Sequence, residues 1–385
     1  MKPKKHLSFG SLRHGLSSFF NGFPDTRESE KINYSIHDAM MSGFACMYFQ
    51  DPSLLQFQKQ LKEIENLHNL QTLFGVNDIP GSTVLRDIID ETKSEHFRSI
   101  FKDYFSRLQR HKYLSQYQLF PNLYICSLDA TQYFHSQSIK CDGCLTSKHK
   151  NGTISYSHKV LQAAIIHPDM RQVIPLMPEA IKNIDGSTKQ DCEINSAKRI
   201  IPKIKIDHPQ LDLIITGDGL FSKQPFILDV LSAGYHYIFV AKPDDHKYLM
   251  EWIDTNDKNE LRIIDNKDRT HIYEWSNNVP LSGRKDSIKV NYIRYKIISI
   301  DKNGNEKINY KNSWVTDLEI TTENVVTIAR GARCRWKIEN ECFNTLKNQG
   351  YHLEHYAESF IMPNEIGIIN INWEYIDKAF GIIIT

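Results

Sequence analysis

Three acidic residues have the types and positions that metal-dependent chemistry needs. Asp129 follows the apolar run 123–128, and Asp218 follows the run 211–216, between Gly217 and Gly219. In α/β proteins, ligand groups collect at the carboxyl ends of strands, and hard cations such as Mg²⁺ prefer carboxylate oxygens. The two aspartates therefore form a candidate metal clamp. An aspartate that only caps a turn or a helix would explain each of them equally well.

Glu339 is the third candidate, because of its position on a helix expected over 327–349, with Gly350 as its C-terminal stop. At about 100° per residue, Glu339 falls about 40° from Arg335, within an apolar face, while Glu341 falls on the polar side. That face consists of Ile338, Cys342, Phe343 and Leu346. A carboxylate turned toward the core is costly unless it is paired or binds a metal. An ordinary helical pair with Arg335, four residues earlier, is the alternative.

Alternating strands and helices must hold these acids in place. Apolar runs predict strands at 123–128, 159–166, 211–216 and 235–241, and the segments 191–206 and 225–233 fit helices. This order indicates an α/β sheet. Residues 260–316 instead alternate apolar and polar side chains around a turn at 301–305, which predicts a β-rich insertion.

The chain therefore divides into five expected segments. Residues 1–115 form a helical N-terminal module, 116–245 the first part of the core with Asp129 and Asp218, and 246–320 the β-rich insertion. Residues 321–355 carry the helix with Glu339. The last segment, 356–385, is irregular, as a frameshifted or truncated end would be.

A basic and aromatic stretch lies near the end of the N-terminal module. Arg107, Arg110 and Lys112 are interleaved with aromatic side chains, a mixture that can follow a phosphate backbone. Taken alone, the stretch fits an amphipathic surface helix better.

A pair of cysteines suggests a second metal site. Cys141 and Cys144 have the C-x2-C spacing that makes up half of many structural zinc sites. The remaining ligands would come from His149, His158 or Cys192. Free buried thiols are the alternative.

Composition limits the class of protein. The chain has 385 residues, a 41% hydrophobic fraction and a net charge of +1, as in an ordinary soluble globular protein. It contains no apolar run of membrane-spanning length and no signal-peptide pattern, so a cytoplasmic protein with no membrane partner is expected. Gly-rich phosphate loops, G-x-S-x-G and H-E-x-x-H are missing from the sequence, which argues against those enzyme classes.

Three segments around the acids resemble the catalytic blocks of insertion-sequence DDE transposases. They are residues 127–131, 216–222 and 335–341, and the likeness extends from about Asp25 to His355. The last block is similar to that family's Tyr-x2-Arg-x3-Glu-x6-Lys signature. Ala332 occupies the position of the tyrosine, and Lys347 comes one residue later than the signature lysine.

The resemblance implies an α/β fold with a ribonuclease H-like mixed sheet, flanking helices, the β-rich insertion and the N-terminal helical module. Asp129, Asp218 and Glu339 would hold two Mg²⁺ or Mn²⁺ ions for DNA cleavage and strand transfer. Arg335 and Lys347 would contact phosphates. The partners would be double-stranded DNA, both transposon ends and target, bound by a homodimer at the nucleoid.

Two other functions remain open from the sequence. One is an impaired transposase remnant that only binds DNA, which the irregular end of the chain suggests. The other is a ribonuclease H-like metal-dependent nuclease that acts without regard to end sequence.

Overall fold

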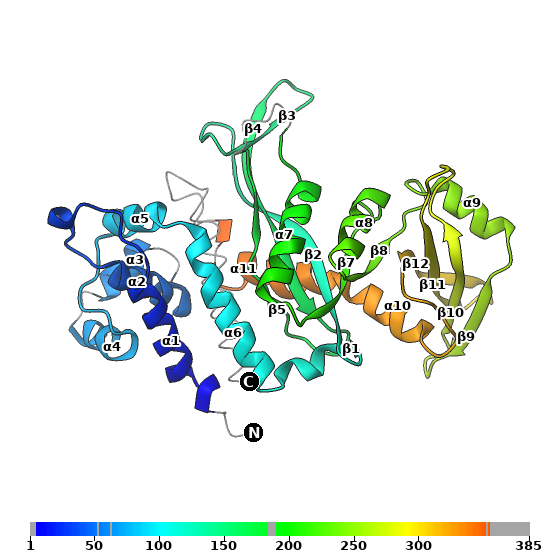
Figure 1. Ribbon diagram of the computed structural model, residues 1–385, viewed down its shortest axis with the longest axis horizontal. Coiled ribbons are helices and arrows are strands. Elements are labelled where there is room, and N and C mark those ends of the chain that lie inside the picture. Colours follow the sequence, from blue (N-terminus) through cyan, green and yellow to red (C-terminus); the bar gives the residue numbers. More distant parts are fainter. Residues whose placement is uncertain (1–4, 52–53, 62–63, 184–189, 352, 355–385) are drawn as a thin grey trace.

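The computed structural model describes residues 5–51, 54–61, 64–183, 190–351 and 353–354. Figure 1 shows three parts in a row, with N-terminal helices at one end, a sheet flanked by helices in the middle and a group of long antiparallel strands at the other end. The predicted irregular segment 356–385 lies outside the described residues.

The centre of the molecule is a mixed sheet. Its order is β3-β4-β2-β7-β8-β12-β11-β10-β9. The short strand β1 (Gln118–Phe120) also pairs with β2, and β5 (Ile174–Pro175) and β6 (Glu179–Ile181) also pair with β4. Strands β2 (Leu123–Ser136), β7 (Asp212–Gly217) and β8 (His236–Val240) run parallel, and β4 (Ile154–Ile166) is antiparallel to β2. The predicted mixed α/β architecture is confirmed, and the four predicted core strands correspond to β2, β4, β7 and β8.

Helices cover both faces of this central part. Ile214 in β7 packs in one apolar cluster with Ile328 and Ala329 of α10 (Val325–Arg333). Its neighbour Ile215 belongs to the other cluster, which contains the buried side chains of α7 (Glu193–Asp207) and α8 (Gln224–Ser232). Successive strand residues point to opposite faces, so α10 lies on one side of the sheet and α7 and α8 lie on the other.

The predicted β-rich insertion is continuous with the same sheet. Helix α9 (Lys247–Thr255) leads into the antiparallel strands β9 (Asn259–Ile264), β10 (Thr270–Pro280), β11 (Lys289–Ile300) and β12 (Glu306–Thr316). Strand β12 then returns to pair with β8 at Trp314–Thr316. The predicted hairpin turn at 301–305 is confirmed: the Asp301 carboxylate accepts the amides of Asn303 and Asn305, and Gly304 has φ +81°.

The N-terminal part is helical, as predicted. It comprises α1 (Phe9–Asn21), α2 (Ile36–Tyr48), α3 (Leu54–Leu61), α4 (Ile64–Phe74), α5 (Ser82–Glu91) and α6 (Arg98–Arg110). In Figure 1, α6 runs between the other helices and the sheet. Arg98 on α6 forms an ion pair with Asp207 at the end of α7, with Nη1 and Oδ2 2.6 Å apart, which ties this module to the core.

The C-terminal helical region differs from the single regular helix predicted over 327–349. After α10 the chain passes through a 3₁₀ turn (Cys334–Trp336), a π-helical segment (Ile338–Phe343) and the short helix α11 (Asn344–Asn348). Gly350 has φ +97°, so its predicted role as the stop is confirmed. Among the described residues, no helix has the length and apolar character needed to cross a membrane.

Candidate active site

The parallel pairing of β2 and β7 places Asp129 next to Asp218, which directly follows the end of β7. Ser127 pairs with Thr216, and each aspartate follows two residues later. The prediction that Asp129 ends its strand is wrong, because β2 continues to Ser136 and Asp129 pairs with Gln162 of β4. The neighbouring strand β7 ends at Gly217, so the edge of β2 that β7 covers is uncovered from Asp129 onward.

Arg335 connects the C-terminal helical region to β2. The Ser127 hydroxyl donates to the Arg335 carbonyl at 3.5 Å, so the chain crosses β2 on the face that carries Ser127 and Asp129. The Arg335 guanidinium lies between two acids: Nη1 is 3.5 Å from Asp129 Oδ2, and Nη2 is 3.0 Å from Glu339 Oε1. The predicted helical pair of Arg335 and Glu339 therefore exists, and it also includes Asp129.

The surroundings of Asp129 favour its neutral form. Burial raises the pKa of this carboxyl to about 7; Arg335 opposes the shift, while the charge of Glu339 and a hydrogen bond with it add to it. Asp129 and Glu339 are therefore close neighbours. A divalent cation between two such groups would favour their ionised forms and reverse this balance.

Asp218 is more exposed than Asp129. Its Oδ1 accepts the Leu220 amide at 2.9 Å, and its Oδ2 lies 3.8 Å from Lys242 Nζ. Asp129, Asp218 and Glu339 do not bring three ligand oxygens within 4.8 Å of one another. Asp129 and Glu339 therefore lie together. Asp218 lies beside them, directly after the end of β7, with its carboxylate directed toward Lys242.

The prediction that the Glu339 side chain faces the core is wrong. Its side chain is 50% exposed, whereas that of Glu341 is 27% exposed. Both residues lie in the π-helical segment, where each residue rotates the chain by less than the 100° assumed for an α-helix. Glu339 is nevertheless the glutamate that meets Asp129, while Glu341 approaches Arg171 at 4.0 Å.

Two charged residues near Asp218 were not predicted as site residues. Lys242 follows β8 by two residues, and Glu193 is the first residue of α7. Burial raises the pKa of Glu193, and the charge of nearby Asp218 raises it further. No sequence signal marks Lys242. Glu193 lies in the segment 191–206 that was predicted to be a helix, but its proximity to Asp218 depends on the tertiary fold.

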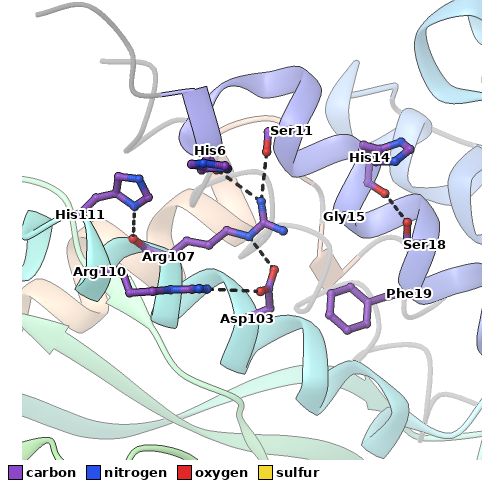
Figure 2. Close-up of a pocket in the computed structure, with 10 residues that line it drawn as sticks. All are labelled: His6, Ser11, His14, Gly15, Ser18, Phe19, Asp103, Arg107, Arg110 and His111. Atoms are coloured by element: carbon purple, nitrogen blue, oxygen red, sulfur yellow. Dashed lines mark hydrogen bonds and ion pairs between the residues drawn. The ribbon is translucent and has the colours of Figure 1, made fainter.

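The other predicted DNA contacts lie elsewhere. Lys347 on α11 pairs with Glu354, Nζ to Oε1 2.7 Å. Arg107 and Arg110 are on α6, and exposed Lys112 follows it; the two arginines line a hollow of about 770 Å³ between α1 and α6. Figure 2 shows the Arg107 guanidinium reaching across this hollow to the Ser11 hydroxyl of α1, while it also bonds to Asp103 of its own helix. Arg107 therefore links α6 to α1, whereas the side chain of Arg110 is 68% exposed.

The cysteine pair gathers one of its three predicted partners. The His158 ring nitrogen Nε2 lies 3.2 Å from both Cys141 Sγ and Cys144 Sγ. His149 instead bonds to the Ser155 hydroxyl through Nε2, and Cys192 is an exposed residue at the start of α7. Neither joins the group of ligand atoms around Cys141 and Cys144.

Comparisons with known protein families and with curated proteins find no match for this chain. The family resemblance of the three acidic segments therefore stays a prediction.

Proposed function

We propose that this chain is a DDE-type DNA transposase that cleaves and joins DNA at the ends of its own element. One observation carries the proposal: Asp129 on β2 and Asp218, directly after the end of the adjacent parallel strand β7, lie at matching positions, and Glu339 meets Asp129 from a separate helical region. These are the three acids that the sequence resemblance selects. The mixed sheet with helices on both faces supports a ribonuclease H-like core.

The donor set suits hard divalent cations. Asp129, Asp218 and Glu339 offer only carboxylate oxygens, which Mg²⁺ and Mn²⁺ prefer. Ions held there would activate the attacking water or hydroxyl and stabilise the leaving oxygen. Because the Arg335 guanidinium contacts Asp129 and Glu339 on one side, it balances two acids that would otherwise repel each other. With cations bound, this guanidinium would be free to hold a DNA phosphate.

DNA would also need contacts away from the acids. Arg110 and Lys112 are exposed at the end of α6, and we assign them to the binding of transposon ends. Lys347 would reach phosphate by giving up its exposed partner Glu354, and such surface pairs are weak. Joining two ends requires two copies of the chain, so a homodimer on DNA is part of the proposal.

The test is cleavage of DNA that carries the sequences flanking this reading frame, with Mg²⁺ or Mn²⁺. Asp129→Asn and Asp218→Asn should each reduce cleavage more than about 100-fold, beyond what outer-shell changes at metal sites cost, while end binding persists. Asp212→Asn, at the other and exposed end of β7, is the matched control and should cleave normally.

Three results would contradict the proposal. Normal cleavage by either site variant would disprove the triad. Wild-type protein that binds the ends and never cuts them would indicate a remnant that only binds DNA. Cleavage without regard to end sequence would indicate a general nuclease.

A further inference from the structure

A compact group of two sulfurs and one ring nitrogen lies on the part of the sheet formed by β2, β3 (Leu145–Lys148) and β4. Cys141 Sγ and Cys144 Sγ are 3.6 Å apart, and His158 Nε2 is 3.2 Å from each of them. The cysteines form no disulfide and lie in the turn before β3, and His158 comes from β4. Among the described residues, this is the one group of three or more such ligand atoms within 4.8 Å of one another.

The spacing of the three atoms is close to that around a tetrahedral zinc ion. With Zn–S near 2.3 Å and Zn–N near 2.0–2.1 Å, ligand atoms around such an ion lie about 3.6–3.8 Å apart. The sulfur pair fits, and the two sulfur–nitrogen distances are about 0.4 Å shorter. Thiolate and imidazole donors select zinc over Mg²⁺ or Mn²⁺, so this site differs in chemistry from the carboxylate site.

Backbone contacts already hold the turn in a ligand-binding shape. The Cys144 amide donates to the Cys141 carbonyl at 3.1 Å, and the Cys141 amide donates to Cys144 Sγ at 3.3 Å. Asn183 fastens the turn from outside, with its side-chain amide donating to the Cys144 carbonyl at 3.1 Å. Contacts of this kind orient metal ligands and stabilise the charge on a thiolate sulfur.

The third ligand is fixed by packing. His158 is 1% exposed, and its ring stacks on Tyr133 at a centroid distance of 6.0 Å and lies 5.5 Å from the ring of Phe134. Both aromatic residues belong to β2, which pairs with β4. The imidazole therefore cannot turn away from the sulfurs without disturbing the β2–β4 packing.

We propose that Cys141, Cys144 and His158 bind one structural zinc ion, with a water molecule as the fourth ligand. A water fits because Cys141 is partly exposed and the described residues offer no further protein ligand in the group. The ion fastens the turn 141–144 onto β4. In Figure 1, β3 and the neighbouring part of β4 project beyond the helices that flank the sheet, so the ion would fasten the turn to a projecting end of the ladder.

The first test measures zinc in the purified full-length protein, kept reduced, supplied with an equivalent of Zn²⁺ and then freed of unbound metal by gel filtration. Wild-type protein should retain one zinc per chain, and Cys141→Ser and His158→Gln should lose it. Cys192→Ser and His149→Gln are the matched controls and should retain zinc. A wild-type protein without zinc, or zinc loss in either control, would overturn this ligand set.

A second measurement needs no substitution and so does not depend on a variant folding. Co²⁺ added to the reduced wild-type protein should give the strong visible absorption of a tetrahedral site and a sulfur-to-cobalt charge-transfer band, both removed by adding Zn²⁺. Weak absorption typical of six oxygen ligands would overturn the proposal. Removing the metal from the zinc-loaded protein with a chelator should lower the melting temperature, because binding energy at a structural site is folding energy.

Discussion

Arg335 and Asp129 form an ion pair between segments more than 200 residues apart in the chain, with Nη1 3.5 Å from Oδ2. The same guanidinium holds Glu339 at 3.0 Å. Arg335 thus supplies positive charge to two neighbouring carboxyls, and this charge is what a divalent cation would supply in the proposed active site. Removing the Arg335 guanidinium should therefore change the stability of the protein differently with and without metal.

We expect Arg335→Met to lower the free energy of unfolding by about 1 kcal/mol in the presence of chelator, because two acids lose their shared, partly exposed partner. Mg²⁺ should restore more stability to this variant than it adds to wild type. Thermal unfolding with EDTA and with Mg²⁺ measures both effects. Arg333→Met, which removes a guanidinium lying over the Tyr310 ring instead, is the control and should show no such gain from Mg²⁺. Equal responses to Mg²⁺ in wild type and Arg335→Met would contradict the prediction.

The two glutamates of the π-helical segment should behave differently. Glu339→Gln should abolish DNA cleavage, because it removes the carboxylate that meets Asp129. Glu341→Gln should leave cleavage within a few-fold of wild type, since Glu341 is directed toward Arg171. Single-turnover cleavage of end-containing DNA compares the two substitutions at matched chemistry. Loss of cleavage in Glu341→Gln with activity kept in Glu339→Gln would reverse the assignment.

The core strands could be predicted from the sequence because buried strands are continuous apolar runs. The run 123–128 stops at Asp129, although β2 continues to Ser136. As far as Ser127, β2 pairs with β4 on one edge and β7 on the other. After Ser127 it pairs with β4 alone, so polar residues are tolerated and the apolar run ends. The sequence pattern therefore marked the end of the parallel ladder.

The site was predictable in part for similar reasons. Its aspartates stand out because each follows an apolar run, but the contact of Lys242 with Asp218 joins two segments through tertiary packing alone. The π-helical turn around Glu339 also leaves no clear sequence mark, and the assumption of regular α-helix gave that side chain too much burial. Among three possible partners of the cysteine pair, only the pairing of β2 with β4 selects His158.

Gly217 and Gly219, on either side of Asp218, should tolerate alanine unequally. Neither has a positive φ, so a left-handed backbone conformation is not what requires glycine at these positions. A Cβ at Gly217 would lie 2.5 Å from the Phe221 ring, which is buried. A Cβ at Gly219 would meet only the flexible Lys242 side chain, at 3.1 Å.

Gly217→Ala should therefore lower the free energy of unfolding by about 1–3 kcal/mol, the usual cost of overpacking, and disturb the backbone at Asp218. Gly219→Ala should cost less than Gly217→Ala, because the Lys242 side chain that its Cβ would meet is flexible and can move aside. Denaturant unfolding of both variants beside wild type provides the comparison. A destabilised Gly219→Ala with an unaffected Gly217→Ala would show that close packing is not what requires glycine here.

Asp90, on α5 of the N-terminal module, should make stability depend on pH. Burial raises the pKa of its carboxyl to about 7, with a further contribution from the charge of Asp87 and opposition from Arg86. Between pH 4 and 7 the Asp90 carboxyl therefore keeps its proton in the folded protein and loses it in the unfolded chain. The contribution of Asp90 to stability decreases as the pH rises from about 4 through 7.

The free energy of unfolding of Asp90→Asn should match that of wild type near pH 4 and exceed it by on the order of 2 kcal/mol at pH 8. Urea unfolding across this range measures the difference, with exposed Asp78→Asn as the control. A difference that stays constant with pH would mean that Asp90 ionises alike in the folded and unfolded chain.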